Sequence, residues 1–277
     1  MNIFQAVILG IIQGITEFLP VSSSAHLVLV PYFAGWNFPQ VESFTFDVLV
    51  HWGTLLAVLV YFWKDVARIV LDFAAGLLNG QPFADAKSRQ GWLLIIATIP
   101  AGIAGLLLKK LVEMAFGSPT MTGIFLMVTA VLLLAGEFIG RRTKTMADMD
   151  WKDALWIGGF QMLSIFPGIS RSGSTIAAGG VRNLDRAEAA RFSFLLSIPI
   201  MLSAGLLQLF DFMNYPALAV MDALPAVLTG ALVSAVVGYF SIRWLLAFLK
   251  NNSLVWFSGY CFLVGAITLF ITFYINR

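Results

Sequence analysis

Two short stretches of the sequence hold nearly all of the side chains that could do chemistry. Residues 13–27 read QGITEFLPVSSSAHL, in which a carboxylate, Glu17, precedes a proline, three serines and His26. Residues 167–175 read PGISRSGST, in which Arg171 lies among serines and a threonine. A hydroxyl, an imidazole and a carboxylate can serve as nucleophile, proton carrier and orienting group, and an arginine binds phosphate through two hydrogen bonds. If the two stretches meet, they predict a site that binds a tetrahedral oxyanion and acts on it.

The composition places these stretches in a membrane protein. Hydrophobic residues make up 59% of the 277 positions and charged residues 12%, with a mean hydropathy of +0.87, whereas a soluble domain is about a quarter charged. The net charge is only +2 and no long basic run is present, so no nucleic-acid partner is expected. The single cysteine, Cys261, excludes a disulfide framework within the chain.

Six apolar segments approach or reach the roughly 17–25 residues that a membrane-spanning helix needs. We expect an all-α polytopic membrane protein, with the long fifth segment kinked or broken near Gly238. The six segments are 44–63, 92–108, 119–140, 192–211, 222–249 and 254–275.

The two chemistry-bearing stretches are too interrupted by polar residues, proline and glycine to be ordinary spans. Each is best explained as two short half-helices joined by an elbow. Lipid tolerates irregular backbone only where protein or a water-filled cavity satisfies it, so we expect two re-entrant helix hairpins buried in the bundle. Two ordinary kinked helices are the alternative.

The two hairpins resemble each other at an offset of 148 positions, which aligns Gly10 with Gly158, Gln13 with Gln161 and Ser22 with Ser170. Three crossings follow each hairpin, and an odd number inverts the second half. The sequence therefore predicts a single membrane domain, 1–277, built as an inverted-topology repeat of residues 1–140 and 154–277. Interrupted helices of such repeats meet near the bilayer midplane.

The charges of the loops set the orientation. Thirteen basic residues fall in the segments 64–91, 141–153, 182–191 and 241–250, and positive loops prefer the cytoplasm. The chain ends and the loops 109–118 and 212–221 are then expected outside. The basic loops need no ligand to explain them.

Arg171 and Glu17 are the only charged residues within the two elbows. A charge at the bilayer centre costs about 2.5–3.5 kcal/mol on insertion scales, and arginine keeps its proton, so Arg171 needs an anion and Glu17 is the nearest candidate. A purely structural ion pair is one explanation. The six serines near the pair favour an anion site instead, since the helix N-termini that follow each elbow also attract anions.

The remaining candidates are two histidines and a glutamine. His26 shares a helix face with the serines before it, while His51 could line a cavity together with Asp47, one turn earlier. Gln13 and Glu17, also one turn apart, could share a divalent cation, Mg²⁺ or Ca²⁺, with the phosphate as a further ligand.

At these motifs the sequence resembles the bacterial undecaprenyl-diphosphate phosphatase family, which is associated with bacitracin resistance. The resemblance covers essentially the whole chain and implies hydrolysis of a polyprenyl diphosphate lipid, a divalent cation, a fold of six crossings with two re-entrant hairpins, and an active site at the outer face of the bacterial plasma (inner) membrane. Gln13 stands where the family motif allows glutamate or glutamine. The resemblance implies catalytic roles for Glu17, His26 and Ser23, and diphosphate binding by Arg171, Ser170, Ser172, Thr175 and Ser22.

The predicted inverted repeat is also compatible with functions other than hydrolysis. Inverted repeats with broken helices are typical of transporters, so a lipid-phosphate flippase or small-anion carrier is the main alternative, and a phosphatase that also flips its product is a hybrid of the two. An intramembrane serine protease using Ser172 lacks a clear histidine partner. The nucleophile (serine, histidine or water) stays open at this point, as does the oligomeric state, for which a homodimer is one option.

Overall fold

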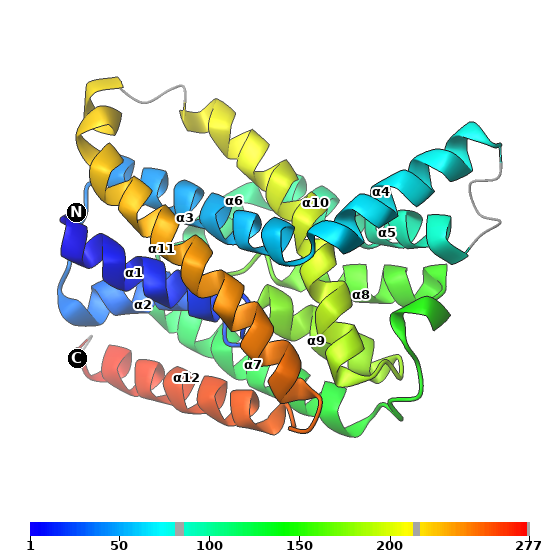
Figure 1. Ribbon diagram of the computed structural model, residues 1–277. Coiled ribbons are helices and arrows are strands. Elements are labelled where there is room, and N and C mark those ends of the chain that lie inside the picture. The colour runs from blue at the N-terminus through cyan, green and yellow to red at the C-terminus, as the bar shows by residue number, and fades with distance from the viewer. Residues whose placement is uncertain (81–85, 213–216, 276–277) are drawn as a thin grey trace.

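The computed structural model describes residues 1–80, 86–212 and 217–275 (Figure 1). Within these ranges every regular element is a helix. Of the outer loop expected at 212–221, residues 213–216 fall outside the described ranges, and residues 217–221 are helical. In chain order the helices are α1 (Ile3–Thr16), α2 (Ser23–Ala34), α3 (Gln40–Tyr61), α4 (Trp63–Leu78), α5 (Ala86–Leu107), α6 (Lys109–Phe116), α7 (Pro119–Phe138), the 3-10 turn η1 (Met146–Asp148), α8 (Trp151–Leu163), α9 (Arg171–Val181), α10 (Arg186–Phe212), α11 (Ala217–Leu249) and α12 (Val255–Ile275).

Six of these helices are long and apolar enough to cross a membrane, which confirms the predicted all-α polytopic membrane protein. The candidate spans agree with the predicted segments to within a few residues at most ends. They are Glu42–Tyr61, Ser88–Leu107, Pro119–Phe138, Arg186–Leu207, Leu224–Leu249 and Val255–Tyr274.

The structure corrects three details of the predicted elements. Helices α4 and α6 occupy the predicted loops 64–91 and 109–118, and α4 pairs with α5 in an arm that extends to the right of Figure 1. Helix α11 is not broken at Gly238. A Cβ there would lie 2.8 Å from the ring of Phe18, so this glycine allows the first elbow to pack closely against α11.

The two interrupted stretches form two pairs of short helices, α1–α2 and α8–α9. Their lengths are 14, 12, 13 and 11 residues, and at about 1.5 Å per residue each covers at most about two thirds of a hydrocarbon core about 30 Å thick. Half-helices were predicted for both stretches. That the pairs re-enter the membrane from opposite faces stays a prediction.

The first helix of each predicted repeat packs against a helix of the other repeat. Helix α1 lies against α11 of the second half, and α8 lies against α5 of the first half. The contacts use glycines at the aligned positions: a Cβ on Gly10 would lie 2.6 Å from the carbonyl oxygen of Gly230, and one on Gly158 would lie 2.5 Å from that of Ala97. Close backbone approach is thus required at both crossings, although the repeat itself stays a prediction.

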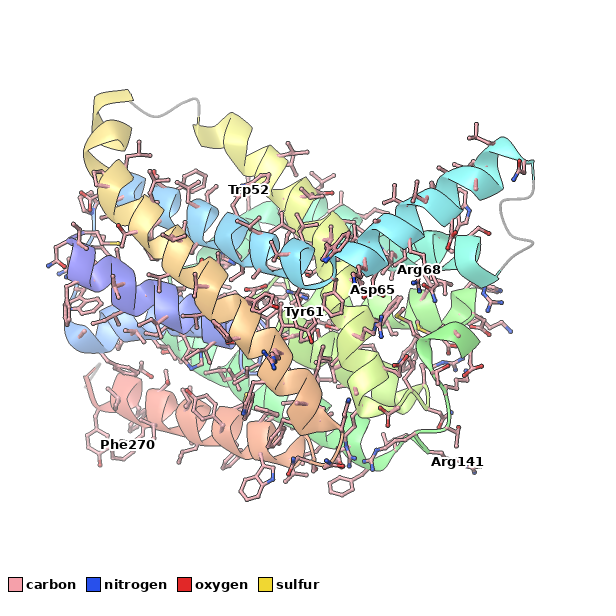
Figure 2. All side chains as sticks on the ribbon, viewed as in Figure 1. Trp52, Tyr61, Asp65, Arg68, Arg141 and Phe270 are labelled. Carbon is pink, nitrogen blue, oxygen red and sulfur yellow. The ribbon has the colours of Figure 1, made fainter. Side chains whose placement is uncertain are left out.

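Two of the loop arginines, Arg68 and Arg141, are labelled in Figure 2 and lie toward the end of the bundle opposite the start of α1. Other basic residues of the predicted cytoplasmic segments hold two buried carboxylates. Asp153 is fully buried and receives Arg182 Nε at 2.6 Å and Lys144 Nζ at 3.1 Å, while Glu137 receives Arg142 Nη2 at 2.7 Å and also pairs with Arg186. These pairs fasten the 139–150 linker to the bundle, a role that the loop charges did not reveal.

Candidate active site

The first elbow, residues 17–22, links α1 to α2. Glu17 follows the last residue of α1, and its N–H still donates to the Gln13 carbonyl. Ser22 caps α2 by accepting from the Ala25 N–H at 3.3 Å, and its backbone has φ +71° and ψ +99°. A non-glycine residue in such a conformation costs about 1–3 kcal/mol and persists only when its surroundings hold it.

The second elbow, residues 164–170, links α8 to α9 and is held from α7. Thr129 donates from Oγ1 to the Gly168 carbonyl at 2.8 Å and accepts from the Ser170 N–H at 3.0 Å. Gly168 has φ +104°, a conformation that glycine adopts without strain. Ser170 then caps α9 by accepting from the Gly173 N–H at 3.0 Å.

The two elbows meet, as the sequence predicts. Arg171 Nη2 donates to Glu17 Oε1 at 2.7 Å, across 154 positions of the chain. A second link is the Ser172 hydroxyl, which donates to the Leu19 carbonyl at 3.2 Å. Arg171 also donates from Nη1 to the Ser193 carbonyl at 3.1 Å, so its guanidinium is fixed on two sides and still has N–H groups to offer a ligand.

The Glu17 carboxylate is the centre of the cluster. Its Oε2 accepts from the Ser23 hydroxyl at 2.7 Å and from Gln13 Nε2 at 3.1 Å, and His51 Nε2 lies 3.8 Å away. Glu17 is 7% exposed, so these donors and Arg171 replace the water that a carboxylate needs. A hydroxyl aimed at a buried carboxylate is the arrangement that activates an oxygen nucleophile.

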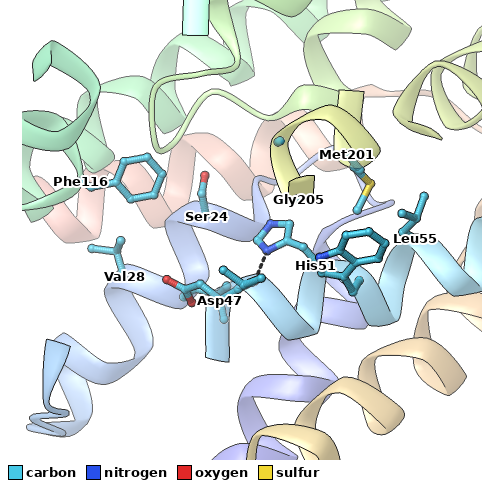
Figure 3. Close-up of a pocket in the computed structure, with 12 residues that line it drawn as sticks. Ser24, Val28, Asp47, His51, Leu55, Phe116, Met201 and Gly205 are labelled. Carbon is cyan, nitrogen blue, oxygen red and sulfur yellow. Dashed lines mark hydrogen bonds between the residues drawn. The ribbon is translucent and has the colours of Figure 1, made fainter. Parts of the chain in front are cut away.

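This cluster opens into a cavity of about 230 Å³ between the elbows, which we call the central cavity. A second space of about 250 Å³, the adjoining chamber, shares part of its wall, and Figure 3 shows His51 there with Met201 and Gly205 of α10 nearby. The chamber is mostly apolar apart from Ser24, Asp47 and His51. The shared wall residues are Ser24, His51, Phe116, Met201 and Ala204.

His26, predicted to be catalytic, has both ring nitrogens engaged away from Glu17. Nδ1 lies 2.7 Å from the Ser22 carbonyl oxygen and Nε2 lies 2.7 Å from the Tyr260 hydroxyl. His26 is not among the residues that line the central cavity. Its catalytic role stays a prediction, and its geometry is that of a side chain that supports the elbow.

The predicted phosphate ligands divide into two groups. Arg171 and Ser22 line the central cavity, as does Ser23, which was predicted to be catalytic. Ser170, Ser172 and Thr175 are each 1% exposed, and their hydroxyls bond within the protein; Thr175 Oγ1, for example, lies 2.7 Å from Ser193 Oγ. Arg171 therefore faces the cavity, whereas the hydroxyls of Ser170, Ser172 and Thr175 are used in hydrogen bonds within the protein.

Several residues of the cavity wall were not among the main site residues predicted from the sequence. His51 was a secondary candidate, yet it lies beside Glu17 and lines both spaces. Gln161 and Ser164 also line the central cavity. Gln161 donates from Nε2 to the Ala97 carbonyl at 3.2 Å, and its buried Oε1 has no hydrogen-bond partner. The alignment of Gln161 with Gln13 was the signal that could have singled it out.

The predicted cation pair, Gln13 and Glu17, fits a hard cation by donor chemistry. Gln13 is fully buried, and its Oε1, the atom that a cation would bind, has no hydrogen-bond partner. The amide presents Nε2 to Glu17, so the structure as it stands shows a carboxylate held by hydrogen-bond donors. Carboxylate and amide oxygens are the ligands that Mg²⁺ and Ca²⁺ prefer.

Comparison with known proteins bears directly on this site. A family model described as "Bacitracin resistance protein BacA" matches residues 6–267. The chain belongs to this family. The match includes both elbows, and it confirms the resemblance drawn from the two motifs.

Curated relatives of the family align along essentially the full chain. A protein of Methanosphaera stadtmanae is 42% identical, over 98% of this chain and 99% of its own length. A protein of Chlorobium limicola is 43% identical, over 96% and 95%, and one of Moorella thermoacetica is 40% identical, over 100% of both chains. All three are named undecaprenyl-diphosphatase.

Proposed function

We propose that this protein hydrolyses undecaprenyl diphosphate to undecaprenyl phosphate and phosphate, recycling the carrier lipid for peptidoglycan synthesis. The observation that carries the proposal is the cluster of Glu17, Arg171 and Ser23 on the wall of a cavity between two buried elbows. The names of the full-length relatives support the same reaction. No observation favours the transporter alternative.

Arg171 binds the terminal phosphoryl group. Its guanidinium is held by Glu17 and the Ser193 carbonyl, so it is oriented before the substrate arrives. The first N–H groups of α2 and α9 have no partner within their helices and add partial positive charge at the same place. Charge that develops on the phosphoryl oxygens during transfer is stabilised by such fixed donors.

Ser23 and Glu17 supply the attacking group. As Ser23 Oγ bonds to the terminal phosphorus, its proton passes to Glu17 Oε2, which lies 2.7 Å away, and the bond from phosphorus to the bridging oxygen breaks. Undecaprenyl phosphate leaves with that oxygen. Water then attacks the phosphorus of the phosphoserine, the bond from phosphorus to Ser23 Oγ breaks, and Glu17 returns its proton to Oγ. The phosphate departs as H₂PO₄⁻, with the oxygen and both protons of that water. Glu17 thus serves first as base and then as acid.

A divalent cation belongs to the proposal as a cofactor, with Gln13 and Glu17 among its ligands. When bound it would neutralise charge on the diphosphate. Chelation is expected to suppress phosphate release, and added Mg²⁺ or Ca²⁺ to restore it. Full activity after chelation would show that the reaction needs no divalent cation.

The substrate lipid reaches the site from the membrane. The adjoining chamber is mostly apolar and continues from the central cavity, so it suits the first isoprene units while the head group meets Arg171. We further propose that the site opens to the outer face of the plasma membrane, because the basic end of the bundle is expected in the cytoplasm. A homodimer is a further prediction, which cross-linking in membranes tests.

The test of the function is phosphate release from a polyprenyl diphosphate by the purified protein in lipid nanodiscs. Wild type should turn the substrate over, and Arg171→Ala should lose about 10²–10³ in rate, as when other transition-state charge contacts are removed. Arg68→Ala, an exposed arginine at the basic end, is the matched control and should retain activity. A wild type that releases no phosphate would refute the function.

A further inference from the structure

Tyr260 of α12 reaches the first elbow from the other end of the chain. Its hydroxyl lies 2.7 Å from His26 Nε2, across 234 positions, and the two rings stack with centroids 5.7 Å apart and planes 10° apart. Neither motif of the sequence includes Tyr260. It does not line the central cavity, and the partner of its hydroxyl is His26, so the hydroxyl can act on the reaction through that ring.

The hydrogen bonds fix the state of the His26 ring. Nδ1 faces the Ser22 carbonyl oxygen, which can only accept, so Nδ1 carries the hydrogen. In a neutral imidazole Nε2 is then the acceptor, and the Tyr260 hydroxyl is its donor. Tyr260, His26 and the Ser22 carbonyl therefore form one directed chain of hydrogen bonds.

That chain ends on the most strained residue of the site. Ser22 is one of three non-glycine residues with positive φ in the part of the chain that the structure describes, and its ψ of +99° lies outside the usual left-handed region. The next residue, Ser23, donates its hydroxyl to Glu17 at 2.7 Å. The orientation of the Ser22 peptide decides where α2 begins and so where the Ser23 side chain points.

We propose that Tyr260 is a positioning residue of this enzyme: the Tyr260–His26 pair holds the Ser22 carbonyl and thereby aims the Ser23 hydroxyl at Glu17. The inference rests on the proposed role of Ser23 in hydrolysis. The second elbow has a glycine at its positive-φ position and is held by Thr129, so it needs no such pair.

The first test replaces only the hydroxyl. Tyr260→Phe keeps the ring stack and should lower kcat about tenfold, the upper range of the effect expected when one hydrogen bond is lost. KM should change less than about twofold because no substrate contact is removed. Tyr274→Phe, the same change on the same helix at a residue 62% exposed, is the matched control and should leave kcat unchanged. Wild-type kcat in Tyr260→Phe would overturn the proposal.

The second test separates positioning from general stability. Glycine adopts positive φ without strain, so a Ser22→Gly background no longer needs the pair. Tyr260→Phe should then cost less than about twofold in kcat, relative to Ser22→Gly alone, a non-additivity expected of coupled neighbours. An undiminished tenfold cost in that background would mean that Tyr260 acts elsewhere.

A third measurement does not depend on activity. In ¹⁵N NMR of protein labelled at histidine, His26 should show a protonated Nδ1 and a hydrogen-bonded Nε2, and Tyr260→Phe should move only the Nε2 signal toward that of a free imidazole. A protonated Nε2 in the wild type would refute the proposed chain. Absence of phosphate release with the expected spectrum would refute the hydrolytic function and leave the hydrogen-bond chain standing.

Discussion

The two elbows are built alike but use their side chains differently. Ser22 and Ser170 are aligned in the predicted repeat, and both cap the helix that follows. The next positions, Ser23 and Arg171, are both the first residue of that helix, and both donate to Glu17, one to each carboxylate oxygen. In the proposed mechanism one elbow thus contributes the oxygen nucleophile and the other a fixed positive charge.

The difference continues in the neighbouring side chains. The first elbow carries the only carboxylate of the pair and opens three serines to the cavities, whereas the second keeps Ser170, Ser172 and Thr175 in internal hydrogen bonds. In the proposed mechanism the first elbow is the reactive one, and the second contributes Arg171 and otherwise supports the site. Removing Glu17, Ser23 or Arg171 should therefore impair chemistry, whereas removing one of the internally bonded hydroxyls of the second elbow should impair stability.

The largest expected effect is that of Glu17→Gln. The amide keeps the size of the side chain but cannot take the Ser23 proton, and it leaves Arg171 without a counter-charge. We expect kcat to fall by about 10³ or more, within the range that proton transfer and charge stabilisation contribute, measured as phosphate release in nanodiscs.

Folding of this variant is checked by its elution profile and thermal unfolding in detergent. A folded variant that keeps a tenth of wild-type activity would show that Glu17 only holds the elbows together. Loss of folding would point the same way, toward a structural ion pair.

A pair of serine variants sharpens the comparison. Ser23→Ala should lower kcat by about 10²–10⁴ with little change in unfolding temperature. Ser170→Ala removes a helix cap and should cost about 1 kcal/mol of stability, with a much smaller effect on kcat at a temperature where the variant is folded. If Ser170→Ala lowered kcat more than Ser23→Ala, the reactive hydroxyl would belong to the second elbow and the comparison would be wrong.

Much of this site could be predicted from particular residues. Glu17 and Arg171 are charged residues in interrupted apolar stretches, and the energetic cost of burying a charge alone predicts that they pair. The six spans followed from the length of apolar runs. Neither argument depends on the detailed placement of side chains.

The rest depends on tertiary packing that local spacing does not encode. The His26 ring turns toward Tyr260, 234 positions away, and Ser172 binds the Leu19 carbonyl; neither partner can be read from the motifs. Gly238 suggested a break in α11, but its lack of a side chain serves the close approach of Phe18.

The smallest predicted effect concerns the glycines that seat the elbow helices. A Cβ at Gly158 would meet the Ala97 carbonyl, whereas one at the neighbouring Gly159 would meet nothing within 4 Å. Gly158→Ala should destabilise by about 1–3 kcal/mol through overpacking, and Gly159→Ala should be neutral or stabilising by up to about 1 kcal/mol through helix propensity. Unfolding in detergent compares the two, and equal stabilities would contradict the tight α8–α5 crossing.

The most direct test of the central claim, that both elbows act on one phosphoryl group, is an experimental structure in nanodiscs with a non-hydrolysable polyprenyl diphosphonate. The terminal phosphonate is expected within hydrogen-bond distance of Arg171 and Ser23, with the polyprenyl chain leading into the adjoining chamber. A phosphonate bound elsewhere, with the Glu17–Arg171 pair undisturbed and no ligand in the central cavity, would contradict it.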